Sequence, residues 1–139
     1  MIRTFVDSGV LIAAARADRF ESEPALRLLE DANRKLLTSV FVRLEVYPKP
    51  AFHESALQTA FLKGFFTEPS VEWADDLRAL VDLAVGEAER RGLAAMDALH
   101  SAAALLLGAD EFITTEKPGK PIYRAEGFSV VHISALRLT

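Results

Sequence analysis

Cysteine is absent from this 139-residue chain. Its absence excludes disulfide cross-links, thiolate catalysis and cysteine-ligated zinc. Histidine is scarce as well, with three residues in all. Any catalysis or metal binding must therefore use oxygen and histidine ligands.

Long apolar runs and an excess of basic residues are also missing. No apolar segment approaches the length that spans a bilayer, and the first residues lack the basic-then-apolar order of a signal peptide. We therefore expect a cytoplasmic protein with no membrane contact. The formal net charge of −4 argues against a non-specific polyanion binder. Nucleic-acid binding would have to rely on local basic patches or on metal ions.

The residues that are present have the balance of a globular protein, with 50% apolar and 26% charged side chains. The length suits one domain with a sizeable core. The sequence contains no internal repeat, low-complexity tract or linker that would mark a boundary. We therefore expect residues 1–139 to form a single domain.

Strand-like and helix-like patterns alternate along the chain. Short segments rich in β-forming residues predict strands, at 2–6, 35–39, 111–114 and 128–133, with a further short one at 71–73. Apolar residues at helical spacing predict the helices, at 10–17, 22–33, 39–47, 53–66, 74–91 and 98–107. Pro48 and Pro50 are expected to stop the third helix. This order predicts an α/β fold, a three-layer α/β/α sandwich with a mostly parallel central sheet.

Four carboxylates stand out by their positions: Asp7, Glu45, Asp97 and Glu116. Asp7 and Glu116 follow predicted strands, so both should lie at the carboxyl edge of the sheet, where parallel α/β proteins bind ligands. Glu45 interrupts an apolar helical stripe, and Asp97 precedes an almost wholly apolar helix.

Each acid also has a simpler structural explanation. Asp7 could be a turn residue, Asp97 a helix N-cap and Glu116 an exposed loop charge. Taken together they are harder to explain in this way, because two carboxylates ~5 Å apart repel each other by roughly 3 kcal/mol at an effective dielectric of about 20. Either some of the acids have raised pKa values or a hard divalent cation neutralises them. Mg²⁺ or Mn²⁺ bound there could activate water for attack on a phosphodiester.

Four segments in order, 5–12, 39–46, 96–103 and 107–116, resemble the PIN domain family, in particular its VapC-like toxins. The resemblance implies an α/β/α sandwich, a Mg²⁺- or Mn²⁺-dependent endoribonuclease activity on RNA, frequent homodimers, and inhibition by a small antitoxin protein. Asp7, Glu45 and Asp97 match the family's three core acids as metal ligands and catalytic residues. Glu116 stands where the family usually has aspartate; it keeps the charge and reaches one methylene further.

Several other residues near these acids have two readings. Ser8 could hold Asp7 or a metal-bound water, or it could cap a helix. His100 is more readily a hydrogen-bonded interior histidine than a general base. The basic residues close to the acids in sequence could bind phosphates; they are Arg43, Lys49, Lys117, Lys120 and Arg124. The aromatic residues of 61–73 fit the core better than a partner groove.

Two other functions compete with that of a nuclease. A phosphoaspartyl phosphatase would need a second aspartate two residues after the first, where this chain has Gly9, and a receiver domain would need adjoining acids near the first strand. A non-catalytic PIN-like module that binds RNA or protein stays open. The sequence does not separate a toxin from a housekeeping nuclease, nor Mg²⁺ from Mn²⁺.

Overall fold

The structure is a computed structural model and describes residues 1–136. Its sheet has five strands in the order β3-β2-β1-β4-β5, and every neighbouring pair is parallel. The strands are β1 (Ile2–Val6), β2 (Arg34–Ser39), β3 (Glu72–Ala74), β4 (Glu111–Thr114) and β5 (Ser129–His132). The helices are α1 (Ser8–Arg16), α2 (Ser22–Leu29), α3 (Val40–Val46), α4 (Pro48–Phe52), α5 (Ala56–Thr67), α6 (Leu77–Arg91) and α7 (Ala95–Leu106), with 3₁₀ turns η1 (Pro121–Arg124) and η2 (Ile133–Ala135).

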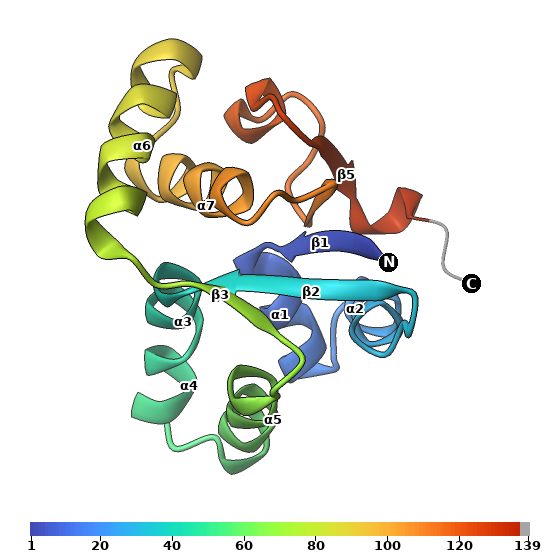
Figure 1. Ribbon diagram of the computed structural model, residues 1–139. Coiled ribbons are helices and arrows are strands. Elements are labelled where there is room, and N and C mark those ends of the chain that lie inside the picture. The colour runs from blue at the N-terminus through green and yellow to red at the C-terminus, as the bar shows by residue number, and fades with distance from the viewer. Residues whose placement is uncertain (137–139) are drawn as a thin grey trace.

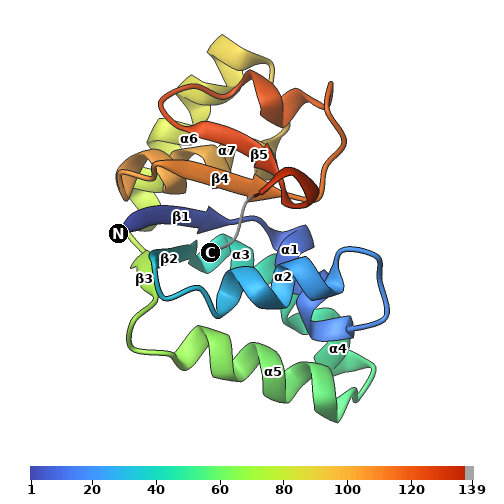
Figure 2. The same ribbon diagram turned by 90° about the vertical axis from the view of Figure 1, so that its right-hand side faces the viewer.

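Helices cover both faces of the sheet (Figure 1). Helices α1 to α5 pack on one face, and α6 and α7 pack on the other, as the turned view in Figure 2 also shows. The chain moves from β1 to β3 in one direction, then crosses over and continues from β4 to β5 on the other side of β1. Right-handed crossovers in opposite directions put the connecting helices on opposite faces. The predicted three-layer α/β/α fold is confirmed.

The order of the strands reverses between β1 and β4, which lie side by side. Such a reversal leaves a crevice at the carboxyl ends of the two strands, where α/β proteins bind ligands. Both strands are covered on both faces, so successive residues at their centres are apolar on either side of the sheet. Phe5, Val6, Phe112 and Ile113 are fully buried. The rigid centre of the core therefore lies directly beneath the crevice.

Several predicted helix boundaries were wrong. Helix α1 begins at Ser8 with Asp7 as its N-cap, and α7 begins at Ala95, so Asp97 is its third residue rather than its cap. Pro48 does not end the helical stretch but begins α4, because a proline at the first position of a helix needs no N–H. Helix α6 starts at Leu77, since β3 takes up residues 72–74.

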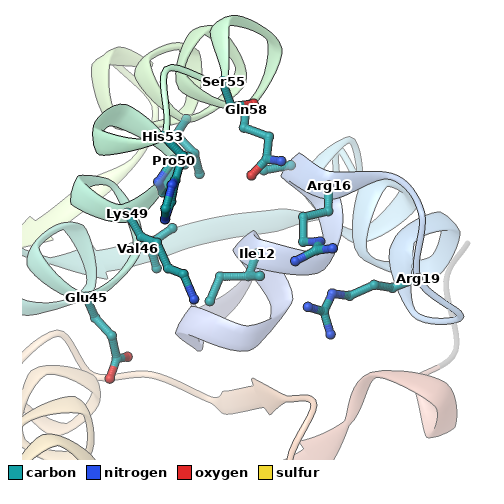
Figure 3. A pocket seen from close by; sticks show the side chains of 12 residues that line it. Ile12, Arg16, Arg19, Glu45, Val46, Lys49, Pro50, His53, Ser55 and Gln58 are labelled. Atoms are coloured by element: carbon teal, nitrogen blue, oxygen red, sulfur yellow. The ribbon is translucent and has the colours of Figure 1, made fainter.

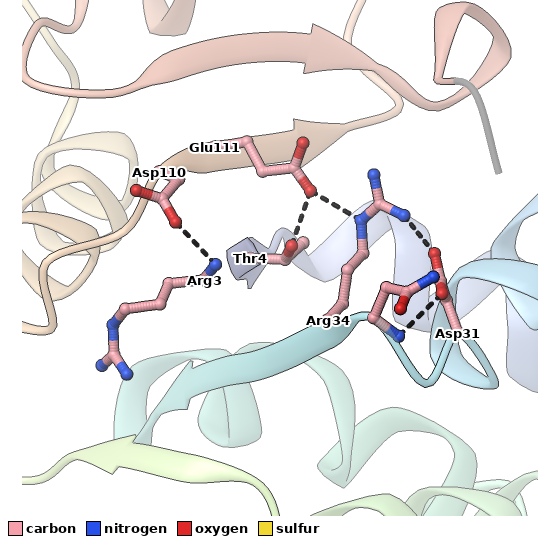
Figure 4. A network of polar contacts seen from close by, with 7 residues as sticks. Arg3, Thr4, Asp31, Arg34, Asp110 and Glu111 are labelled. Carbon is pink, nitrogen blue, oxygen red and sulfur yellow. Dashed lines mark hydrogen bonds and ion pairs between the residues drawn. The ribbon is translucent and has the colours of Figure 1, made fainter. Parts of the chain in front are cut away.

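The opposite edge of the sheet, at the amino ends of the strands, is held by buried ion pairs (Figure 4). The Arg34 guanidinium donates from Nε to Glu111 Oε2 at 2.8 Å and is also paired with Asp31. The side chains of Arg34 and Asp31 are 5% and 3% exposed. The Asp110 carboxylate accepts a hydrogen bond from the Arg3 backbone N–H at 2.8 Å. Within residues 1–136, no helix is long and apolar enough to cross a membrane.

Candidate active site

Asp7 lies at the end of β1, in the crevice beside β4. Its carboxylate accepts hydrogen bonds from the Ser8 backbone N–H at 2.8 Å and from the Thr114 hydroxyl at 2.7 Å. Only 9% of the residue is exposed. Burial raises the pKa of Asp7 above its ordinary value, although these hydrogen bonds and the nearby His100 act in the opposite direction. The fold thus holds one carboxylate in a fixed position and at an electrostatic cost.

Asp97 is half-buried in the first turn of α7 and is electrostatically coupled to the other three acids. Burial raises its pKa, and the charge of Asp7 raises it further, followed by smaller contributions from Glu116 and Glu45. All four predicted carboxylates therefore share one region, although they come from four different segments. The structure thus brings together the four acids that stand out in the sequence.

Glu45 reaches the same region from α3 and is held there by His100. The two side chains are joined between His100 Nε2 and Glu45 Oε1 at 3.0 Å, and the Ser8 hydroxyl lies 3.4 Å from the same nitrogen. The hydrogen bond from His100 lowers the pKa of Glu45 and keeps its carboxylate ionised. His100 itself is 2% exposed. It is the hydrogen-bonded interior histidine that the sequence favoured, and its partner is a candidate metal ligand.

Glu116 is exposed and lies on the segment that follows β4. Its backbone N–H donates to the Thr114 hydroxyl at 3.0 Å, and its carbonyl accepts from the Tyr123 hydroxyl at 2.7 Å. The same Thr114 hydroxyl donates to Asp7. Thr114 therefore ties the backbone at Glu116 to the Asp7 carboxylate. Burial and then the charge of Glu116 raise the pKa of Tyr123.

A close approach between α1 and the end of β4 fixes the geometry of this corner. A Cβ atom added to Gly9 would lie 2.0 Å from Oγ1 of Thr115, which is far inside van der Waals contact. Glycine is required here by space and not by its backbone angles, because Gly9 is an ordinary residue of α1. The Val-Asp-Ser-Gly pattern of the sequence thus has a steric reason for its last position.

The chemistry of these residues fits a hard divalent cation. Oxygen ligands suit Mg²⁺ and Mn²⁺, and a cation would relieve the burial and mutual repulsion that raise the pKa values of Asp7 and Asp97. Within residues 1–136, no three carboxylate or imidazole groups already stand in a finished metal-ligand arrangement. Asp7, Asp97 and Glu45 would hold the ion, with Glu116 beside them.

Beside the acids lies a groove of about 290 Å³ between α1 on one side and α4 and α5 on the other (Figure 3). Lys49, one of the expected phosphate-binding residues, lines it together with Arg16 and Arg19, which the sequence analysis missed. Arg124 instead donates to backbone carbonyls of Arg91 and Gly92, so its role is structural. No signal in the sequence marks this pair, because isolated surface cations line a common groove only once the fold brings them together.

Fold and acids together define a parallel α/β protein whose crevice at the topological switch point is lined with carboxylates. Residues 4–117 match the model of the PIN domain. The chain belongs to the PIN domain family, as its resemblance indicated. Comparison with curated protein sequences gave no match.

Three solved structures share the fold at low sequence identity. A toxin–antitoxin complex from Klebsiella pneumoniae has a TM-score of 0.65 at 19% identity, covering 94% of this chain and 97% of that one. VapBC2 from Rickettsia felis, bound to a DNA fragment from its promoter, has a TM-score of 0.66 at 16% sequence identity, and the match covers 94% of this chain and 98% of that one. VapC20 from Mycobacterium tuberculosis, a toxin that cleaves the sarcin-ricin loop, has a TM-score of 0.66 at 17% sequence identity, and the match covers 85% of this chain and 92% of that one.

Proposed function

We propose that the protein is a Mg²⁺- or Mn²⁺-dependent endoribonuclease that acts as the toxin of a toxin–antitoxin pair. The observation that carries this proposal is the convergence of the acids on His100 at the carboxyl edge of the sheet. His100 lies on the same helix as Asp97, and its Nε2 lies 3.0 Å from Glu45 and 3.4 Å from the hydroxyl of Ser8, the neighbour of Asp7. Family membership supports it, as does the likeness to a toxin described as cleaving the sarcin-ricin loop. The proposed activity on RNA would take place in the cytoplasm.

In this proposal, Asp7, Glu45 and Asp97 bind the cation, and Glu116 takes part directly or through water. A bound divalent cation supplies an activated water and stabilises negative charge that develops on the phosphate. The protein supplies fixed ligands: Thr114 orients Asp7, and His100 orients Glu45 and keeps it ionised.

The partners of such a toxin would be RNA, a small antitoxin and a second copy of the chain. One of the structural neighbours is a toxin–antitoxin complex. Large apolar side chains on α3 to α5 stand exposed, with Leu44 at 64% and Leu57 at 87%. An exposed apolar surface of this kind is available for protein contacts. Light scattering of the purified protein distinguishes a dimer from the 15.3 kDa monomer.

The direct test compares RNA cleavage by the native protein and by Asp97→Asn, with Mg²⁺ or Mn²⁺ and with EDTA. The substitution removes a carboxylate whose pKa is raised by burial and by Asp7, so its loss does not destabilise the metal-free protein and the variant should stay folded. Asp82→Asn, on the exposed side of α6, is the matched control for loss of one acid. We expect metal-dependent cleavage by the native protein and the control, and a loss of at least about 100-fold in Asp97→Asn.

The contrary result is equally clear. No cleavage of a mixed structured RNA, combined with no Mn²⁺ binding by calorimetry, would leave a non-catalytic PIN-like module for RNA or protein binding as the better description. A genomic observation separates a toxin from a housekeeping nuclease, since a toxin gene should lie beside a small reading frame with a DNA-binding pattern.

A further inference from the structure

The groove beside the acids carries a concentration of positive charge that the overall composition does not suggest. The chain has a net charge of −4, yet Arg16, Arg19 and Lys49 all line this groove. Among its lining residues in the described part of the chain, Glu45 is the one carboxylate. Glu45 belongs to the acid cluster, so the groove opens directly from the proposed cleavage site and changes from negative to positive along its length.

The cationic side chains reach the groove from opposite walls (Figure 3). Lys49 comes from α4, which continues from α3 almost without a break because Tyr47 keeps helical backbone angles. Lys49 thus lies four residues after Glu45 and on the same side of the helical stretch. Arg16 ends α1, and Arg19 follows it in the α1–α2 connection. The ends of these side chains face one shared space.

Hydrogen bonds of Ser22 fix the α1–α2 connection that carries Arg19. The Ser22 hydroxyl is buried, accepts from the Arg19 backbone N–H at 3.0 Å and donates to the Ala13 carbonyl at 2.7 Å. Arg19 and Lys49 make no ion pair with any residue of 1–136, and Arg16 makes an exposed one with Asp18. Exposed pairs of that kind contribute little and exchange readily. These cations are therefore available to an outside anion.

The walls and floor suit a polynucleotide strand. Ile12, Val46 and Leu62 form an apolar floor on which sugars and bases can rest. Guanidinium groups match phosphate geometry with two parallel hydrogen bonds, and lysine binds phosphate as a point charge. Continuity with the acids favours the substrate itself over a separate ligand, because Glu45 belongs both to the acid cluster and to the lining of this groove.

We propose that the groove between α1 and α4–α5 binds the phosphates of single-stranded RNA on one side of the scissile bond, through Arg16, Arg19 and Lys49. This inference rests on the proposed nuclease function and deepens it by naming where the substrate lies. The strand has to be single there, since the groove of about 290 Å³ holds a few groups and not a duplex. Base identity is not read by these contacts, because phosphate contacts position a strand without specifying its sequence.

The test measures RNA binding without cleavage. A short fluorescein-labelled oligouridylate is titrated with protein in EDTA, and the Kd is followed by fluorescence anisotropy from about 50 to 200 mM salt. The variant Arg19→Gln/Lys49→Gln removes the two unpaired cations. Arg27→Gln/Arg78→Gln, which changes the net charge equally on α2 and α6, is the control. Each phosphate contact to a single strand contributes about 0.7 to the slope of log Kd against log salt.

We expect weaker binding and a slope lower by about 1.4 in the groove variant, with little change in the control. An unchanged slope in the groove variant overturns the proposal, and so does an equal fall in the control, which would mean that net charge alone is sensed. A labelled oligoglutamate peptide tests a protein segment as the occupant. If the groove variant loses binding to this peptide while its RNA binding is unchanged, the proposal is overturned in favour of a protein segment.

The RNA-binding experiment and the cleavage experiment can fail independently of each other. Metal-dependent cleavage with an unchanged salt slope leaves the enzyme in place and rejects the groove as the RNA path. A reduced slope without any cleavage supports the groove and rejects the enzyme. Thermal melting of both double variants checks that these exposed substitutions leave the fold intact.

Discussion

Asp7 is the residue at which the demands of folding and of metal chemistry conflict most strongly. It is 9% exposed and its pKa is raised by burial. A raised pKa means that the folded protein binds the proton more tightly than the unfolded chain does. Ionisation of Asp7 therefore destabilises the metal-free protein. The penalty is absent below the ordinary aspartate value of about 3.9 and is fully present above the raised pKa.

Asp7→Asn should remove this penalty. In EDTA at neutral pH, we expect the variant to melt a few degrees higher than the native protein, and we expect the difference to shrink as the pH is lowered towards about 4. Mn²⁺ should raise the melting temperature of the native protein and leave that of the variant unchanged, because only the native site binds the ion. Calorimetric melts across pH measure both effects. A variant that melts lower than the native protein at neutral pH contradicts this account of Asp7.

The four acids could be found from the sequence because each is marked by local context, either a strand end or an apolar helical row. Their supports could not be found in that way. Thr114 is 107 residues from Asp7, and His100 is 55 residues from Glu45. Such pairs are created by strand order and helix packing, which one sequence does not reveal. The two arginines of the groove were missed for a related reason: scattered surface cations carry no signal until the fold brings them together.

At the scale of elements, the contact between α1 and the segment after β4 controls the shape of the site. Gly9→Ala would place a methyl group 2.0 Å from Oγ1 of Thr115. Overpacking of this kind costs about 1–3 kcal/mol. We expect Gly9→Ala to lower the free energy of unfolding by that amount, and Thr115→Ala in the same protein to restore more than half of it. Urea denaturation of the two single variants and the double variant completes the cycle.

Independent, additive effects of the two substitutions would contradict the predicted contact. Cleavage activity gives a second readout, because displacement of α1 moves Asp7 relative to Glu116. The rescued double variant should recover activity along with stability.

Element types were predicted well because apolar periodicity separates buried strands from amphipathic helices. Element boundaries were predicted less well. Proline was read as a stop at position 48, although its backbone geometry also suits the first turn of a helix. The start of α7 was placed too late, because Ala94 caps it without a side-chain hydrogen bond and therefore leaves no mark in the sequence.

At the scale of the whole molecule, the two edges of the sheet have separate roles. The carboxyl edge gathers like charges, whereas the amino edge is held by buried opposite charges around Arg34. Arg34→Met would leave Asp31 and Glu111 buried without their partner. Loss of one member of a buried ion pair costs about 3–5 kcal/mol. We expect that loss in the free energy of unfolding, with cleavage unchanged at temperatures where the variant stays folded.

Arg78→Met is the matched comparison, because Arg78 and Asp82 form an ion pair whose side chains are 90% and 68% exposed. Its removal should change stability by less than about 1 kcal/mol. Equal effects of the two substitutions on urea denaturation would mean that burial at the amino edge does not set the stability of the fold.

The distribution of the four acids along the chain also bears on how the protein is made. Asp7 is synthesised well before Glu116, which follows only after β4, and β4 must insert beside β1. At ordinary translation rates, Asp7 leaves the ribosome roughly 5–20 s before Glu116. A nascent chain therefore carries an incomplete acid cluster until the segment after β4 has emerged, so the proposed nuclease would be inactive while that segment is still being translated from its messenger RNA.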